Sequence, residues 1–194
     1  MSKANLLSKT DPDERKTVLK TIRISESLAR SLEKVATDNG TTVNSYINSV
    51  INRHFHWDKG AAEFGLITID SAFFRGLLEA LDDETLARIG REIMAPRWKE
   101  MSEFFLQDSS PDRILDFLTM RSRINPDKLR TSITKEEGDY TIVCHHDFGP
   151  KLSVVLKSAI QELVKQSFHV EPRLSAGESV VTARFKVKPR NSSV

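Results

Sequence analysis

The stretch Val18-Leu19-Lys20-Thr21-Ile22-Arg23-Ile24-Ser25 decides the architecture that the sequence predicts. Its apolar residues Ile22 and Ile24 alternate with polar ones, and a period of two predicts a β-strand with one apolar and one polar face. Ser25 then precedes an acidic residue and apolar residues at helical spacing, which indicates an N-cap and an amphipathic helix. The segment therefore predicts a single strand that leads directly into a helix.

Two helices follow this strand. The first ends at Asn39-Gly40, because glycine readily adopts the left-handed conformation that terminates a helix. The second begins at Thr41-Thr42 and carries a full apolar stripe at helical spacing: Val43, Tyr46, Ile47, Val50, Ile51 and Phe55. Strand, helix and helix are complete by about His56, and His54 and His56 are predicted to close the second helix, where a cation favours the dipole.

Composition defines the broad class of the protein. The 194 residues suffice for one or two domains, and 39% hydrophobic with 29% charged residues is typical of a helix-rich globular chain. One cysteine, Cys144, permits neither an internal disulfide nor a multi-thiolate zinc site. No apolar run approaches the roughly 18 residues that span a bilayer, and the first ten residues lack a signal-peptide core. We therefore expect a cytoplasmic protein without a membrane partner.

Beyond the strand and two helices, the chain predicts a larger mixed domain. Pro96 and Pro111 stand where the first turn of a helix accepts proline. After Asn125-Pro126 the pattern predicts two hairpins on either side of a helix that opens at Gly149-Pro150, a ββαββ unit of the α+β class. The second hairpin is expected to start at His169. The expected segments are a flexible arm at 1–17, a strand-helix-helix module at 18–56, a connector at 57–69, an α+β effector or assembly domain at 70–188, and a tail at 189–194.

The strand-helix-helix module poses a packing problem. A unit of about 40 residues rarely forms a sufficient core, and a single strand has no hydrogen-bonding partner. Both problems are solved if two copies interlock with their strands antiparallel and with Ile22 and Ile24 facing the four helices. The outer face then carries Leu19, Thr21 and Arg23 from each copy, and such a ribbon fits the major groove of B-DNA.

The residues Thr21-Ile22-Arg23-Ile24-Ser25-Glu26-Ser27-Leu28, with Gly40-Thr41-Thr42-Val43-Asn44, resemble the ribbon-helix-helix family of transcriptional repressors over residues 18–56. The resemblance implies an obligate homodimer that inserts its ribbon into the major groove. Carried over by position, it implies base-reading residues at Leu19, Thr21 and Arg23, and phosphate contacts at the backbone amides near Thr42, Val43 and Asn44. Leu19 departs from the polar residue often found there and can at most meet a thymine methyl group.

The chemistry of these residues agrees with that implication. Arg23 can donate two hydrogen bonds to one guanine, which is worth about 1–3 kcal/mol of discrimination. A helix N-terminus suits a phosphate, and Lys20 adds a non-specific, salt-sensitive contact. The alternative, an edge strand with a solvated polar face, leaves the strand unpaired and the helix pair unexplained. The expected partners are double-stranded DNA, a second copy or a higher oligomer, and an unknown effector; we predict neither a cofactor nor catalysis.

Cys144-His145-His146-Asp147 is the one cluster that suggests other chemistry. On a strand Cys144 and His146 share a face, which makes them the candidate metal ligands, although a half-buried cysteine beside surface histidines is the preferred interpretation. An enzyme that uses this pair is a further alternative, disfavoured because no positioned third group can be named. The nickel-responsive ribbon-helix-helix regulators also join this module to a metal-sensing domain, but their histidine and cysteine spacing is not matched here.

The role of the C-terminal part stays open at the level of sequence. Residues 140–147 and the helix that follows are faintly similar to small-molecule sensor domains of the four-vinyl-reductase and haem-nitric-oxide type, which implies ligand sensing. Dimer-stabilising or partner-binding scaffolding is the equal alternative, as in an antitoxin-like protein that binds a protein partner. Arg184, Lys186, Lys188 and Arg190 alternate with apolar residues, and we interpret them as a solvated basic face that discourages edge pairing rather than as a second nucleic-acid surface.

Overall fold

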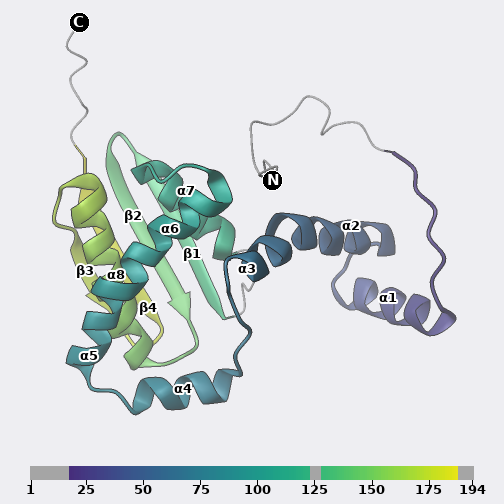
Figure 1. Ribbon diagram of the computed structural model, residues 1–194, viewed down its shortest axis with the longest axis horizontal. Helices are drawn as coiled ribbons and strands as arrows, with labels where there is room; N and C mark the ends of the chain where they lie inside the picture. The colour runs from purple at the N-terminus through teal and green to yellow at the C-terminus, as the bar shows by residue number, and fades with distance from the viewer. Residues whose placement is uncertain (1–17, 123–127, 188–194) are drawn as a thin grey trace, which may run out of the picture. The chain divides into compact units, whose positions relative to one another are not determined.

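The structure is a computed structural model that describes residues 18–122 and 128–187. The chain divides into two units that meet between Ile67 and Thr68, inside the segment 57–69 that the sequence analysis assigns to a connector (Figure 1). The expected arm at 1–17 and tail at 189–194 lie outside the described residues.

The first unit is helical in its described part. It contains α1 (Glu26–Asp38), α2 (Val43–Arg53), the π-helical segment η2 (His54–Asp58) and α3 (Lys59–Glu63). The predicted helix signals are confirmed: the Ser25 hydroxyl accepts a hydrogen bond from the amide of Leu28 at 3.3 Å, and Gly40 follows α1 with φ of +62°. Local sequence therefore sets both ends of α1.

The second helix runs further than the sequence predicts. Its backbone stays right-handed helical at His54 and at Lys59, so α2, η2 and α3 follow one another without a break. His56 Nδ1 lies 2.8 Å from the carbonyl oxygen of Asn52, and an ion pair at 3.3 Å joins Arg53 to Asp58 across the wider π turn. The prediction that His54 and His56 close the helix is wrong, because the backbone stays helical through η2 and α3 to Glu63.

The second unit contains both helices and strands, which confirms the α+β class. Its C-terminal half has the predicted ββαββ order, with the long helix starting at Pro150 as expected. Its elements are α4 (Ser71–Glu79), α5 (Asp83–Arg88), the π-helical segment η3 (Ile89–Met94), α6 (Ala95–Leu106), α7 (Pro111–Ser122), β1 (Leu129–Glu136), β2 (Asp139–His146), α8 (Pro150–Phe168), β3 (Arg173–Ala176) and β4 (Val180–Lys186).

The four strands form one antiparallel sheet in the order β1-β2-β4-β3. β1 and β2 are joined by a turn in which Glu137 and Gly138 both have positive φ, as a two-residue hairpin turn requires. β3 begins later than predicted, because α8 continues to Phe168 and His169 ends it in the left-handed conformation. β4 is an interior strand, so the interpretation of Arg184 and Lys186 as protection for a sheet edge is wrong.

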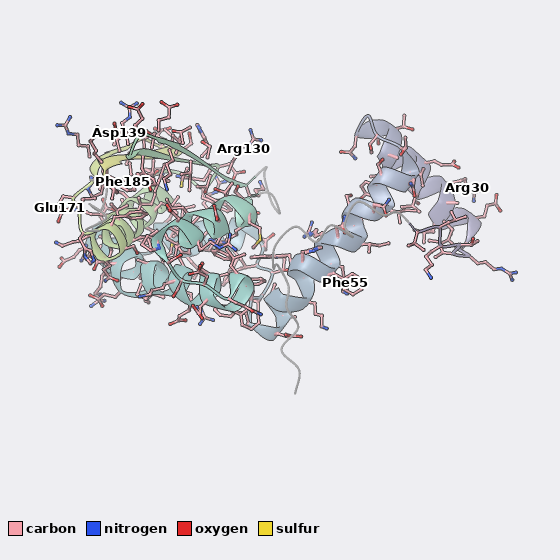
Figure 2. All side chains as sticks on the ribbon, turned by 90° about the horizontal axis from the view of Figure 1, so that it is seen from above. Arg30, Phe55, Arg130, Asp139, Glu171 and Phe185 are labelled. Atoms are coloured by element: carbon pink, nitrogen blue, oxygen red, sulfur yellow. The ribbon has the colours of Figure 1, made fainter. Side chains whose placement is uncertain are left out.

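Helices cover one face of this sheet (Figure 2). The strand residues that face them are buried: Tyr140, Ile142 and Cys144 from β2, and Val181, Ala183 and Phe185 from β4. η3 packs closely on α8, since a Cβ atom placed on Gly90 would lie 2.4 Å from the carbonyl oxygen of Val155. The second unit therefore has a well-packed core of its own, and the opposite face of the sheet stays open.

Candidate nucleic-acid interface

Residues 18–25 lie in neither a helix nor a strand, and all eight are exposed. The four strands of the sheet all belong to the second unit, and no strand of the described residues pairs with this segment. The prediction of a strand is thus not met within one chain, because a strand forms only when a neighbouring strand accepts its hydrogen bonds. Whether residues 18–25 pair depends on a second chain.

The residues assigned to base reading point to solvent. Leu19 is 93% exposed, and Thr21 and Arg23 are exposed as well. Within residues 18–122 and 128–187, neither Lys20 nor Arg23 takes part in an ion pair or a side-chain hydrogen bond. Their charges are available to an external anion.

At the N-terminus of α2 a side-chain hydroxyl is hydrogen-bonded within the helix, and two backbone amides are not. Thr42 is the N-cap: its hydroxyl accepts a hydrogen bond from the Ser45 amide at 3.1 Å and lies 2.9 Å from the Ser45 hydroxyl. In the single chain this exposed hydroxyl caps the helix, and its predicted phosphate contact stays a prediction. The amides of Val43 and Asn44 have no hydrogen-bond acceptor in the described part of the chain, as is usual in the first turn of a helix.

The apolar stripes of α1 and α2 lie open. Among the described residues of these two helices, Ala36 alone is buried, and α2 contains no buried residue. The exposed fractions are large for apolar side chains: Ile22 61%, Ile24 40%, Leu28 48%, Val50 49%, Ile51 46% and Phe55 57%. The amphipathic pattern of the sequence is thus present, but among the described residues its apolar side is covered only in part.

Cys144 and His146 lie on the buried face of β2, each with a different neighbour. The Cys144 sulfur is 3.5 Å from the Thr131 hydroxyl, and burial raises the pKa of this thiol. The His146 ring lies 2.9 Å from the Ser153 hydroxyl, which donates to the carbonyl of Gly177 at 2.6 Å, and burial lowers the pKa of this imidazole. Both side chains belong to the core, and the expectation that the histidine lies at the surface is wrong for His146.

The arrangement around Cys144 and His146 favours a structural role. Ser153 uses its proton on Gly177, so it accepts the His146 Nε2 proton, while Nδ1 accepts from the amide of Phe148 at 3.4 Å. In this tautomer the imidazole is not placed to act as a base toward Ser153. Among the described residues, no group of three or more histidine, cysteine, aspartate or glutamate side chains could hold a metal ion.

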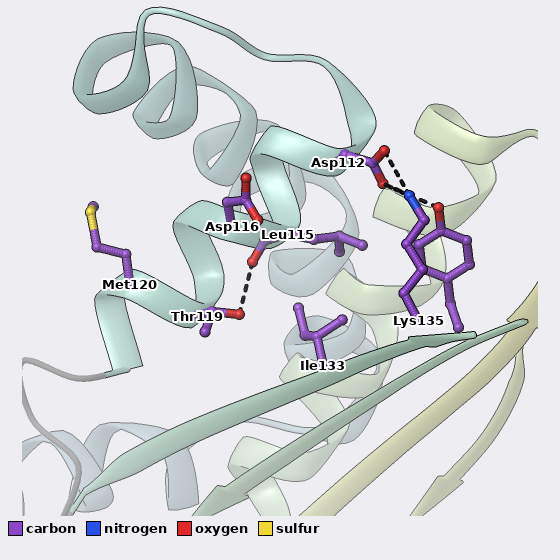
Figure 3. A pocket seen from close by; sticks show the side chains of 8 residues that line it. Asp112, Leu115, Asp116, Thr119, Met120, Ile133 and Lys135 are labelled. Carbon is purple, nitrogen blue, oxygen red and sulfur yellow. Dashed lines mark hydrogen bonds and ion pairs between the residues drawn. The ribbon is translucent and has the colours of Figure 1, made fainter. Parts of the chain in front are cut away.

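A groove of about 550 Å³ lies between α7 and β1 (Figure 3). Its polar groups bind one another: Lys135 Nζ lies 2.9 and 3.0 Å from the two carboxylate oxygens of Asp112, and the Tyr140 hydroxyl donates to Asp112 at 3.1 Å. Hydrogen bonding to Tyr140 and Asp112 raises the pKa of Lys135. These mutually satisfied groups present no activated nucleophile or base.

Comparison with protein-family models and with curated proteins finds no match to this chain. In the part of the chain that the structure describes, no helix is long and apolar enough to cross a membrane. Nothing in the local sequence marks Arg130 and Arg173, which the strand register places opposite His145 and Arg184. A pairing of this kind leaves no local sequence signal, because register is set by the whole sheet.

Proposed function

We propose that this protein is a sequence-specific DNA-binding regulator, a repressor, that acts as a homodimer through its N-terminal unit. Two copies pair residues 18–25 into an antiparallel ribbon above their four helices, and the ribbon enters the major groove. The observation that supports this most is the small core around α1 and α2: among the described residues of these helices only Ala36 is buried, and no described strand pairs with the segment before them.

A second copy satisfies both needs at once. The ribbon gives each strand its hydrogen-bonding neighbour, and the even-numbered residues Ile22 and Ile24 then turn toward the helices. Pairing with the second copy also covers the exposed stripe that carries Val50, Ile51 and Phe55. Apolar patches of this size on a soluble chain are typical of protein interfaces.

The odd-numbered side chains supply the contacts to DNA. Leu19, Thr21 and Arg23 lie on the outer face of the ribbon, where Arg23 binds a guanine edge and Thr21 donates, accepts or meets a methyl group. The amides of Val43 and Asn44 hold a phosphate at the N-terminus of α2, with the helix dipole adding attraction. Lys20 contributes a contact to the DNA backbone that does not depend on sequence.

Retention of random-sequence duplexes tests this function. The full chain is mixed with a duplex library, bound DNA is recovered and sequenced, and the result is compared with that of Arg23→Ala. We expect the wild type to enrich an inverted repeat, as a two-fold symmetric dimer requires, and the variant to lose guanine at one position of each half-site. A wild-type pool without enriched sequence overturns the proposal, and a protein partner bound by residues 70–188 points instead to the antitoxin-like alternative.

A further inference from the structure

The open face of the sheet carries an unusual arrangement of charge. We call it the outer sheet face, and in Figure 2 Arg130 and Asp139 lie on this side while Phe185 faces the helices. Strand alternation and burial assign its residues. They are Arg130, Ser132, Thr134 and Glu136 from β1; Asp139, Thr141, Val143 and His145 from β2; Arg173 and Ser175 from β3; and Val180, Thr182, Arg184 and Lys186 from β4.

Basic residues stand directly opposite basic residues on this face. The register pairs Arg130 with His145 and Arg173 with Arg184. Like charges in facing positions of a sheet, as at Arg173 and Arg184, are destabilising. Among the described residues, none of these four side chains has an ion pair or a hydrogen bond. The face therefore holds guanidinium groups that have no counter-ion among the described residues of this unit.

The acidic residues of the outer sheet face do not compensate these pairs. Glu136 and Asp139 stand opposite each other beside the hairpin turn, and Asp139 is already bound by Lys186 at 2.9 Å. The row between the two basic pairs holds Ser132, Val143, Thr182 and Ser175, and Thr134 and Thr141 stand in the row of Arg184; the hydroxyl side chains among them are hydrogen-bond donors. A flat field of hydroxyl and guanidinium donors suits phosphate oxygens.

We propose that the outer sheet face binds the phosphate backbone of nucleic acid, as a second contact surface separate from the N-terminal unit. The two basic pairs are four residues apart along β2, from His145 to Thr141, and hence about 13 Å apart in that direction. One extended polyanion can contact both pairs, whereas a single phosphate ion cannot. The contact is independent of base sequence, because these groups meet the backbone rather than base edges.

The apolar content of the face argues against a membrane as the partner. Binding to a lipid surface uses large apolar side chains that enter the acyl region. The outer sheet face contains only Val143 and Val180 of this kind, and both are partly buried among their neighbours. Charge complementarity is thus its main means of binding, which fits a nucleic acid.

The test compares two double variants of the full chain. Arg173→Gln with Arg184→Gln removes the facing pair, and Arg88→Gln with Arg91→Gln removes the same charge from exposed positions on α5 and η3. Binding to a random-sequence DNA duplex is measured between low and high salt. Loss of two phosphate contacts lowers the slope of log affinity against log salt by about 1.8. If wild type and variant bind alike at 1 M salt, the variant therefore binds about 60-fold more weakly than the wild type at 0.1 M salt. The control variant should bind as the wild type does.

A second measurement separates binding from folding. Removal of the facing like charges should raise the melting temperature by about 1–2 °C while it weakens binding. The inference is overturned if the two double variants bind DNA equally, or if the Arg173→Gln, Arg184→Gln variant changes its oligomeric state. It is also overturned if that variant binds DNA as the wild type does and loses binding only to vesicles that carry anionic lipid. Arg23→Ala tests the sequence preference of the proposed function, whereas the Arg173→Gln, Arg184→Gln variant tests binding to random-sequence DNA. Either proposal can therefore fail while the other holds.

Discussion

Replacement of Ile22 by alanine distinguishes an interlocked dimer from a single chain with a solvated N-terminal segment. Ile22 is 61% exposed in the single chain, so its replacement there should change stability by less than about 0.5 kcal/mol. Full burial of an isoleucine side chain is worth about 1.5–3 kcal/mol, of which about 0.9–1.8 remains to be gained in a dimer. Alanine retains one of the four side-chain carbons, so the loss is about 1.4–2.8 kcal/mol per dimer, or about 10- to 100-fold in the dimer Kd.

Sedimentation equilibrium over a range of protein concentrations measures this effect. The matched control is Ile67→Ala, the same change at a residue that is 86% exposed and lies outside the strand-helix-helix module. We expect the wild type and the control to dimerise equally and Ile22→Ala to dimerise more weakly, with unchanged helical content in circular dichroism. If the two variants dimerise alike, or if the wild type stays monomeric at every concentration, the reasoning is refuted.

Three further outcomes follow from the described contacts. Arg23→Ala should lower affinity for the selected site by about 1–3 kcal/mol, whereas Lys20→Ala should weaken cognate and random duplexes alike and reduce the salt slope by about 1, as filter binding at several salt concentrations measures. Gly90→Ala places a methyl group 2.4 Å from a carbonyl oxygen of α8 and should destabilise the fold by about 1–3 kcal/mol or more in urea unfolding; Gly76→Ala, with no atom within 4 Å, should not. Burial lowers the pKa of His146 below 6.5, so below that pH the unfolded chain binds a proton that the folded chain rejects; stability should fall there, and His146→Gln should reduce that fall.

Features set by neighbouring residues could be predicted from the sequence. Ser25, Gly40 and the Gly149-Pro150 pair each mark a helix end through local backbone chemistry, and the structure has helix ends at all three. The return to a period of two after residue 128 likewise predicted both hairpins. These signals need only a few residues of context, which explains why they could be interpreted correctly.

Features set by distant residues could not be predicted. The pairing of β2 with β4 joins residues separated by α8, so neither the interior position of β4 nor the facing of Arg173 with Arg184 has a local signature. The helical continuation through η2 was missed for a different, local reason: the backbone stays helical through a π turn where His54 and His56 suggest an end. The pairing of residues 18–25 depends on a second chain and stays a prediction.

The helical run from Val43 to Glu63 gives the N-terminal unit one long continuous helix. At 1.5 Å per residue its 21 positions extend about 31 Å, roughly twice the length of α2 alone. A helix of this length acts as a lever: a tilt of about 5° at the end that carries Val43 displaces the end that carries Glu63 by nearly 3 Å. Small adjustments at the N-terminus of α2, where we propose a phosphate contact, would thus be converted into displacements larger than a bond length at its far end.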